Sequence, residues 1–238
     1  MATYDTAEYF ALHSQDYHPR RLRVAVRWIG KLIREDDDLF DVGCGTGLVL
    51  EAMRGAGLTR LAGCDTARAA LRTATERVDF TSHLGSILDE DFVAGLGEYR
   101  FVTMAAVLHH VVGPTRRASH RMAEAAVRNS LSLVRPGGRL LIVEPTYRPR
   151  WAMTAVFWAK RTLGVLIGNR RLELGRWNNL GAPLVSFYSP DEIVAIVEAA
   201  GGKVIRHRDR TARLQRIPRL FGIRGRWFTT VMAVRSGS

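Results

Sequence analysis

The feature that most constrains the fold of this sequence is a glycine-rich segment, Asp41–Gly47, which joins an apolar run at 39–42 to a helical stretch starting at Leu48. Glycine adopts positive φ and has no Cβ to block an approaching ligand, and the helix start offers free N–H groups. Counting from Gly43, Leu48 stands where the third glycine of a dinucleotide fingerprint would fall, and no Gly-Lys-Ser/Thr of a P-loop follows. By itself the segment predicts a tight structural turn or a ligand held against the main chain.

Downstream of this loop, short apolar runs alternate with helical stretches, which is typical of an α/β fold on a parallel sheet. Proline and paired glycines predict a turn at 135–138. Ser189, Pro190 and Glu192 form a capping pattern for a helix that stops at Gly201. Strands are expected at 39–42, 60–64, 78–82, 100–104, 139–144, 203–208 and 227–234, and other helices at 48–55, 66–77 and 116–133.

Two segments lie outside this alternation. Residues 1–36 precede the first strand and look helical and rich in aromatic side chains. Residues 147–188 separate the fifth strand from the capped helix, and a connection of this length is usually a structured element with a function. The pattern predicts a single domain, 1–238, with an N-terminal helical cap (1–36) and an inserted substrate lid (147–188).

The composition fits an intracellular globular protein, since 47% hydrophobic and 24% charged residues are ordinary values. Two cysteines, Cys44 and Cys64, cannot form a disulfide framework and suit a reducing compartment. The first residues lack the profile of a secretory signal, and no uncharged apolar run is long enough to span a bilayer. We therefore expect a cytoplasmic protein without a membrane-spanning helix.

The net charge of +12 is carried almost wholly by arginine, because Lys31, Lys160 and Lys203 are the only lysines. A basic surface of this kind is either simply well solvated or recognises an anionic substrate, an anionic membrane or nucleic acid. The arginine-rich run at 206–226 leaves the same choice between a solvated hairpin and an anion-contacting surface. Charge alone does not choose among these alternatives.

Asp65 follows the second expected strand directly. A carboxylate at this point of a parallel sheet is placed to accept hydrogen bonds from the ribose diol of a ligand bound at the switch point. Capping of the following helix is the alternative role, and the two roles can coexist. Asp65 therefore strengthens the prediction that the glycine loop binds a nucleoside.

With these residues in place, the sequence over 37–208 resembles the class I S-adenosylmethionine-dependent methyltransferase family. Leu39–Gly47 is similar to the first motif of that family and Leu61–Asp65 to its ribose-binding strand; further similar segments are 101–111, 133–140, 188–192 and 199–202. The resemblance implies a Rossmann-like, seven-stranded, mostly parallel sheet with helices on both faces and an antiparallel last strand. It also implies an enzyme that uses S-adenosyl-L-methionine.

The resemblance implies a cofactor site in which the glycine loop passes under the methionine part and the N-terminal segment folds over the ligand. The sequence departs from the family at Ser86, near which many relatives carry an adenine-contacting Asp, and at Arg100, where many carry an Asp. Ser86 or the main chain must then make the adenine contacts. Cofactor contacts are expected at Tyr9, Asp41, Gly43, Cys44, Gly45, Gly47, Asp65, Thr66, Ser86, Ile87, Met104 and Ala105, without a metal ion.

Methyl transfer from a sulfonium is an in-line displacement, and a general base can take the proton of the nucleophile. His109 and His110 follow the fourth strand and Glu144 ends the fifth, so these three are the candidate catalytic residues. A histidine suits proton removal from a hydroxyl or a carboxylic acid. Packing near the cofactor is the alternative for the histidines, and cation binding or a strand-end hydrogen bond is the alternative for Glu144.

The insertion gives the best indication of the methyl acceptor. Residues 151–168 combine bulky apolar side chains with the pair Lys160-Arg161. A lid helix here would face a hydrophobic small molecule, and an interfacial helix would make peripheral contact with a membrane; packing against the core is the third alternative. The bulky side chains are Trp151, Met153, Phe157 and Trp158.

The sequence lacks the Pro-Cys setting and the Asn/Asp-Pro-Pro-aromatic motif of the best-known nucleic-acid methylators. It predicts methyl transfer to a small, fairly hydrophobic or lipid-like acceptor, at oxygen. An RNA or protein methyltransferase that exploits the basic surface is one alternative, and a non-methylating S-adenosylmethionine-binding protein is the other. The sequence does not indicate an oligomeric state.

Overall fold

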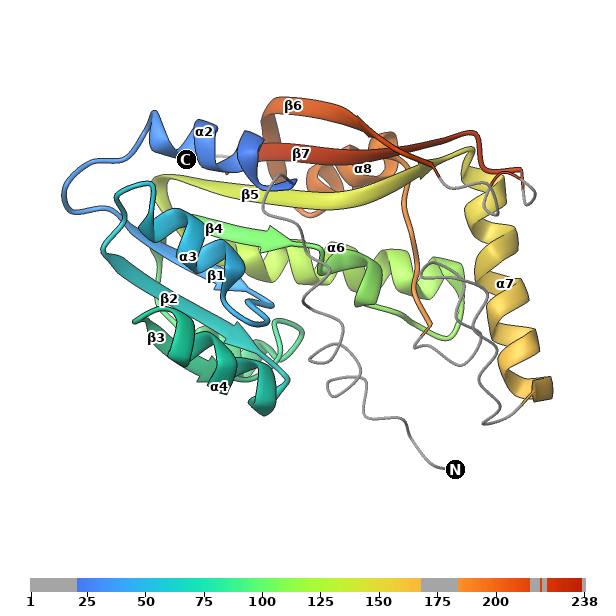
Figure 1. The fold of residues 1–238 in the computed structure, drawn as a ribbon, viewed down its shortest axis with the longest axis horizontal. Helices are drawn as coiled ribbons and strands as arrows, with labels where there is room; N and C mark the ends of the chain where they lie inside the picture. Colours follow the sequence, from blue (N-terminus) through green and yellow to red (C-terminus); the bar gives the residue numbers. More distant parts are fainter. Residues whose placement is uncertain (1–20, 168–183, 215–218, 220–221, 237–238) are drawn as a thin grey trace.

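A seven-stranded sheet forms the centre of the molecule in a computed structural model that describes residues 21–167, 184–214, 219 and 222–236. The strand order is β3-β2-β1-β4-β5-β7-β6 (Figure 1). β7 pairs antiparallel with both of its neighbours, and the other strands share one direction, which confirms the predicted fold. The strands are β1 Asp38–Val42, β2 Arg60–Asp65, β3 Thr81–Leu84, β4 Tyr99–Ala105, β5 Val134–Arg148, β6 Gly202–Ala212 and β7 Gly225–Arg235.

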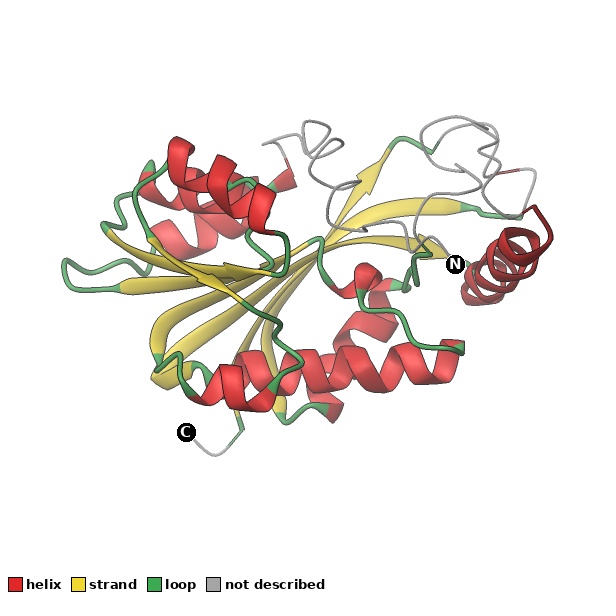
Figure 2. Cartoon of the chain, turned by 90° about the horizontal axis from the view of Figure 1, so that it is seen from below, coloured by secondary structure: helices red, strands yellow, loops and turns green. Residues whose placement is uncertain are grey.

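Helices cover both faces of the sheet (Figure 2). On one face lie α2 (Arg23–Gly30), α3 (Leu48–Arg54) and α4 (Arg68–Arg77), whose apolar side chains pack with Leu39, Phe101 and Leu141 of the sheet. On the other face lie α5 (Glu90–Ala94), α6 (Arg116–Ser132) and α8 (Pro190–Ala199), which share a core with Phe40, Val102 and Ile142. Alternate residues of each strand thus enter opposite cores, as the period of a strand requires.

The helix starts that the sequence marks are formed as expected. Ser189 accepts a hydrogen bond from the backbone of Glu192, whose carboxylate accepts one from the Ser189 backbone, so α8 begins with the predicted capping box. At the start of α6 the Thr115 hydroxyl accepts a single capping hydrogen bond from the N–H of Ala118. These caps determine the residue at which each helix begins after its loop at the carboxyl edge of the sheet.

Several boundaries differ from the sequence-based expectation. β3 begins at Thr81 because the N–H of Val78 still closes the last turn of α4. The predicted turn at 135–138 is a bulge within β5, since Tyr99 pairs with Val134 and Phe101 with Arg139. β5 also continues past Glu144 to Arg148, because β7 pairs with it along its whole second half. The short helix α5 and the 3₁₀ turn η3 (Leu108–His110) were not expected.

The inserted segment starts with α7 (Arg150–Ile167), which lies beyond the carboxyl end of β5 (Figure 1). Ala152 and Met153 of α7 pack with Tyr147 and Ile223 in a small apolar cluster. The rest of the predicted lid, 168–183, and the N-terminal segment 1–20 lie outside the described residues. Among the helices that are described, none has the length and hydropathy needed to cross a membrane.

Candidate functional site

The glycine loop is fastened to the end of the second strand. The N–H of Cys44 donates to the carbonyl of Cys64 at 2.9 Å, and the N–H of Gly45 donates to Oδ2 of Asp65 at 2.8 Å. Gly43 has φ +64°, and a Cβ on it would lie 2.7 Å from a methyl carbon of Val107. The glycine at position 43 is therefore required both by the backbone conformation and by the close approach of the β4 loop.

Asp65 does not cap α4, because the N-cap residue of that helix is Ala67 and no side chain caps it. The second oxygen of Asp65, Oδ1, accepts the N–H of Ala67 at 2.8 Å, so the carboxylate ties the glycine loop to the start of α4. The side chain is half-buried, and a carboxylate has about four acceptor positions, of which these N–H groups occupy two. The remaining acceptor capacity is what a ribose diol at this position would use.

Asp41 lies beneath the glycine loop and is fully buried. Its Oδ1 accepts the hydroxyl hydrogen of Thr103 at 2.6 Å, whereas its Oδ2 is buried without a hydrogen-bond partner among the described residues. Burial raises the pKa of Asp41 to about 7, although the Thr103 hydrogen bond opposes the shift. A buried carboxylate with one unused oxygen suits a cationic ligand group, so these residues fit the methionine end of S-adenosylmethionine.

Other expected cofactor residues are divided between the site edge and the core. Ser86 accepts the N–H of Leu88 in the turn after β3, and Thr66 is exposed between β2 and α4. The side chains of Ile87 and Met104 are buried in the core cluster. Ala105 ends β4, Gly47 precedes α3, and Tyr9 lies outside the described residues.

Glu144 holds the loop that follows β4 through hydrogen bonds. Its Oε1 accepts the N–H groups of Val107 at 2.6 Å and Leu108 at 2.7 Å, and its Oε2 lies 2.8 Å from Nδ1 of His109. The preceding residue, Ala106, has φ +60°, a strained conformation for a residue with a Cβ. Three hydrogen bonds to one buried carboxylate thus hold the strained loop in a single arrangement.

Burial governs the charge states of this pair. It lowers the pKa of His109 to about 3 and raises that of Glu144 to about 7, while the N–H groups of Leu108 and Val107 favour the ionised carboxylate. His109 is therefore neutral at pH 7. When Glu144 is ionised, the imidazole donates Nδ1–H to it, which leaves Nε2 as a proton acceptor. Burial also lowers the pKa of His110, whose ring centre is 4.0 Å from that of His109.

A second polar cluster holds the chain that passes over His109. Ser186 donates its N–H to the carbonyl of His109 at 2.9 Å, and the ring of Phe187 stacks on the imidazole at 5.2 Å between centres. Arg116 donates to the Ser186 hydroxyl and lies 3.5 Å from Glu192, with both side chains nearly buried. The cluster joins the starts of α6 and α8 to the candidate site.

Most of these supporting residues belong to no motif that the sequence shows. Thr103 is the exception, because parallel pairing of β1 with β4 places it opposite Asp41, and a register prediction would have found it. Val107 and Phe187 act through packing and main-chain contacts, which carry no local motif. The structure thus brings His109 and Glu144 together, and brings Asp41, Cys44, Gly45 and Asp65 together around the loop.

A methyltransferase domain family matches residues 14–207, which is most of the chain. A search of curated proteins found no match. Among solved structures, a magnesium protoporphyrin IX methyltransferase (ChlM) from Synechocystis PCC 6803 with bound SAM is 15% identical, with a TM-score of 0.62 over 99% of this chain and 100% of that one.

Two further structures are similar over nearly the whole chain. The CcbJ methyltransferase from Streptomyces caelestis is 15% identical, with a TM-score of 0.62 over 98% of this chain and 100% of that one. A putative methyltransferase from Haloferax volcanii, solved with the Trm112 methyltransferase activator, is 14% identical, with a TM-score of 0.65 over 99% and 100%. At such identities the similarity establishes the shared fold. It does not show that this chain has the same methyl acceptors as those proteins.

Proposed function

The chain belongs to the class I S-adenosylmethionine-dependent methyltransferases, and on that premise we propose that it methylates an oxygen of a small, hydrophobic acceptor. The observation that carries this proposal is the buried pair His109–Glu144, with Nδ1 and Oε2 2.8 Å apart. A carboxylate that fixes one ring nitrogen of a histidine leaves the other in the form that accepts a proton. Such a pair suits an acceptor that must lose a proton during transfer.

The chemistry that the cofactor supplies is an electrophilic methyl group on a positively charged sulfur. An acceptor oxygen would take up this methyl group, with S-adenosylhomocysteine as the other product. The acceptor oxygen becomes strongly acidic as it gains the methyl group, so an imidazole with a lowered pKa can still take its proton at that stage. His109 is the proposed base, and Glu144 is the residue that positions it.

The surroundings of the pair favour an apolar acceptor. Phe187 stacks on His109 and also contacts Tyr147 edge to face. Both belong to the apolar cluster formed with Met153 of α7 and Ile223. An acceptor that reaches His109 from the α7 side therefore meets aromatic and aliphatic side chains, which favour a hydrophobic small molecule over a polyanion.

The test is a screen with S-adenosylmethionine that carries a labelled methyl group. Hydrophobic phenols, alcohols and carboxylic acids form one panel; amines, total RNA and protein extracts form the others. We expect label only in the first panel, as O-methyl ethers or esters identified by mass spectrometry. Label in RNA or protein, or N-methylated products alone, would replace this proposal with one of the alternatives.

The His109→Gln variant separates a base from a packing residue. As a base, His109 accelerates the chemical step, so kcat should fall by about 100-fold or more while the KM for S-adenosylmethionine stays unchanged. A carboxylic acid acceptor ionised at the assay pH needs no base, and there the loss of kcat should be small. Equal loss on phenols and carboxylates would assign His109 to packing.

A further inference from the structure

The charge of the chain is divided unevenly along its length. Residues 1–144 carry 18 Arg and Lys and 18 Asp and Glu, whereas residues 145–238 carry 17 Arg and Lys against 5 Asp and Glu. The whole net charge of +12 therefore belongs to the second part. The part with the glycine loop is balanced, and the part with α7 and the β6–β7 hairpin is strongly basic.

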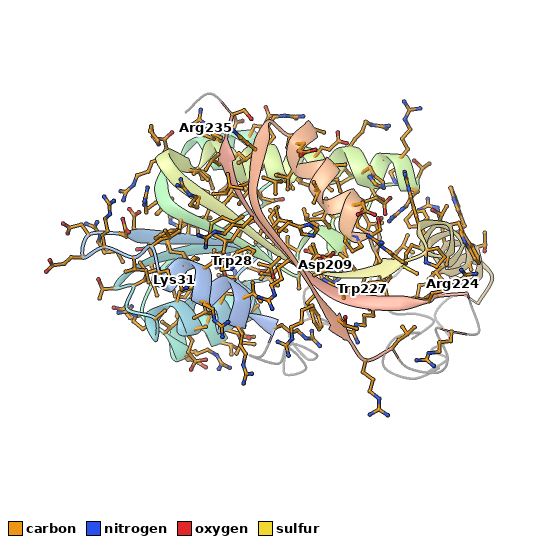
Figure 3. The ribbon with its side chains drawn as sticks, turned by 90° about the horizontal axis from the view of Figure 1, so that it is seen from above. Trp28, Lys31, Asp209, Arg224, Trp227 and Arg235 are labelled. Carbon is orange, nitrogen blue, oxygen red and sulfur yellow. The ribbon has the colours of Figure 1, made fainter. Side chains whose placement is uncertain are left out.

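Five exposed arginines of the basic part lie where α7 meets the far end of the hairpin, and the others lie along β6 or end β7. The N–H of Arg224 donates to the carbonyl of Arg148 at 2.8 Å, which joins β7 to the end of β5 just before α7. In Figure 3 Arg224 lies beside α7, at the opposite end of the molecule from Lys31 and Arg235. The exposed basic residues of this end are Arg148, Arg150, Arg213, Arg219 and Arg224. Arg148 is paired with Asp191 and Arg150 with Glu192, each at 2.9 Å, so Arg213, Arg219 and Arg224 contribute most of the excess positive charge.

The outward face of α7 carries two exposed tryptophans, and the basic residues of the helix are Arg150 at its start and the half-buried pair Lys160-Arg161. Trp151 is 61% and Trp158 42% exposed, and they are two of the four large hydrophobic residues exposed in the described chain. Ala155, Ala159 and Thr162 are also exposed. They lie on the same face of the helix as the tryptophans, because they follow them at intervals of three or four residues. The buried face of α7 packs against the body through Ala152, Met153 and Phe157.

We propose that this end of the molecule, α7 with the surrounding arginines, binds the surface of an anionic lipid bilayer. Trp151 and Trp158 lie in the interfacial layer and the arginines contact lipid phosphates, which is how amphipathic interfacial helices bind. Double-stranded nucleic acid fits less well, because its outward-facing phosphates would meet uncharged tryptophan side chains at the centre of the contact. The docking surface is independent of which acceptor atom is methylated.

Docking in this orientation has a consequence for the site. α7 lies beyond the carboxyl end of β5, the strand that carries Glu144 (Figure 1). Met153 of α7 shares an apolar cluster with Tyr147 and Ile223, and Phe187 packs against that cluster. A bilayer in contact with α7 would therefore lie close to the route by which a hydrophobic acceptor reaches His109.

The test is co-sedimentation of the full chain with vesicles of phosphatidylcholine, with and without phosphatidylglycerol. We expect binding to the anionic vesicles that weakens at high salt. The double variant Trp151→Ala/Trp158→Ala should bind about tenfold more weakly, because binding strength scales with buried apolar area. The double variant Arg213→Gln/Arg224→Gln should lose about fivefold for each arginine removed.

Matched controls come from elsewhere on the surface. Ile205→Ala removes a side chain that is 41% exposed near the start of β6, at the other end of the hairpin. Arg60→Gln/Arg72→Gln removes two exposed arginines from the electrically balanced part of the chain. Both controls should bind vesicles like the unmodified protein. Unchanged S-adenosylmethionine affinity in all variants shows that each one folds.

Three results would overturn the proposal: equal binding to neutral and anionic vesicles, no binding to either, or equal losses in the tryptophan variant and the Ile205 control. An RNA oligonucleotide is the competing probe. Salt-sensitive RNA binding that the tryptophan variant retains, without vesicle binding, would assign the basic surface to nucleic acid. Vesicle binding needs no methyl acceptor, so its failure is distinguishable from failure of the O-methylation proposal.

Discussion

Oε2 of Glu144 lies 2.8 Å from Nδ1 of His109, although the two residues are 35 positions apart. The other oxygen of Glu144 holds the N–H groups of Val107 and Leu108, so one carboxylate orients both the imidazole and the loop that carries it. Glu144 is fully buried, and among the described residues its hydrogen bonds go to these groups. Its role in the proposed mechanism is therefore to position the base rather than to act as one.

Glu144→Gln should lower kcat by about 100-fold, the lower range of what a well-placed base contributes, without changing affinity for S-adenosylmethionine. The unmodified enzyme should gain activity as pH rises through about 7, because the raised pKa of Glu144 delays ionisation of the carboxylate that must accept Nδ1–H. The variant should lack this rise. The pH profile of kcat checks both points. Glu198→Gln on the exposed face of α8 is the control. If Glu144→Gln has the same pH profile as the unmodified enzyme, Glu144 has no part in the mechanism.

Asp65→Asn should weaken binding of S-adenosylmethionine about 10- to 100-fold, because hydrogen bonds to a charged group contribute about 1.5–3 kcal/mol. The amide also disturbs the anchoring of Gly45 and Ala67, so thermal stability should be measured in parallel. Titration calorimetry gives the affinity directly. Asp91→Asn on α5 is the control, and affinity that stays within twofold would refute the ribose assignment.

Gly43→Ala should abolish cofactor binding with a modest loss of stability. The added Cβ would stand 2.7 Å from Val107, and φ at this position is +64°, so both the glycine loop and the loop after β4 must move. Gly30→Ala at the end of α2 is the control, since nothing lies within 4 Å of its Cβ position. Equilibrium dialysis with labelled cofactor compares the two, and retained binding in Gly43→Ala would show that the loop tolerates displacement.

The pH dependence of stability without cofactor should reveal the burial of Asp41. Its folded pKa of about 7 lies above the ordinary 3.8, so the folded form is stabilised fully below about pH 4 and loses that contribution as pH rises through 7. Asp41→Asn removes this titration. The stability of the variant relative to the unmodified protein should therefore increase between pH 4.5 and 7.5, by up to several kcal/mol at about 1.4 kcal/mol per unit. Chemical denaturation across that pH range measures the difference, and a constant difference would contradict it.

Arg116→Met should destabilise the protein by about 3 kcal/mol, because it removes a buried cation that pairs with Glu192 and donates to the Ser186 hydroxyl, although Arg150 and His120 still contact Glu192. Burial opposes ionisation of Glu192, but His120, the Ser189 N–H and Arg116 outweigh it and lower its pKa to about 2. Glu192 therefore stabilises the fold above its ordinary pKa, and this contribution is lost as pH falls towards 2. The loss at pH 7 should appear as a Tm decrease of roughly 6–12 °C. Arg117→Met, one residue along on the exposed side of α6, should leave Tm nearly unchanged.

Most of the fold could be predicted because its signals are local. Alternate glycines after an apolar run, the Ser189 capping box and the proline-glycine punctuation each depend on neighbouring residues, and the strands and helices lie close to where these patterns put them. The end of β5 could not be predicted, since β7, some eighty residues later, is what extends it to Arg148. The same holds for β3, whose start depends on where α4 finishes.

The sequence by itself determined the family and the cofactor, because the glycine loop and Asp65 are short-range motifs whose chemistry follows from residue type and spacing. Only the tertiary structure decided what surrounds them. Parallel pairing put Thr103 against Asp41, and pairing of β4 with β5 put Glu144 under the loop of His109. Burial then set the pKa of each group, and burial is a property of the packed chain that no local pattern of residues encodes.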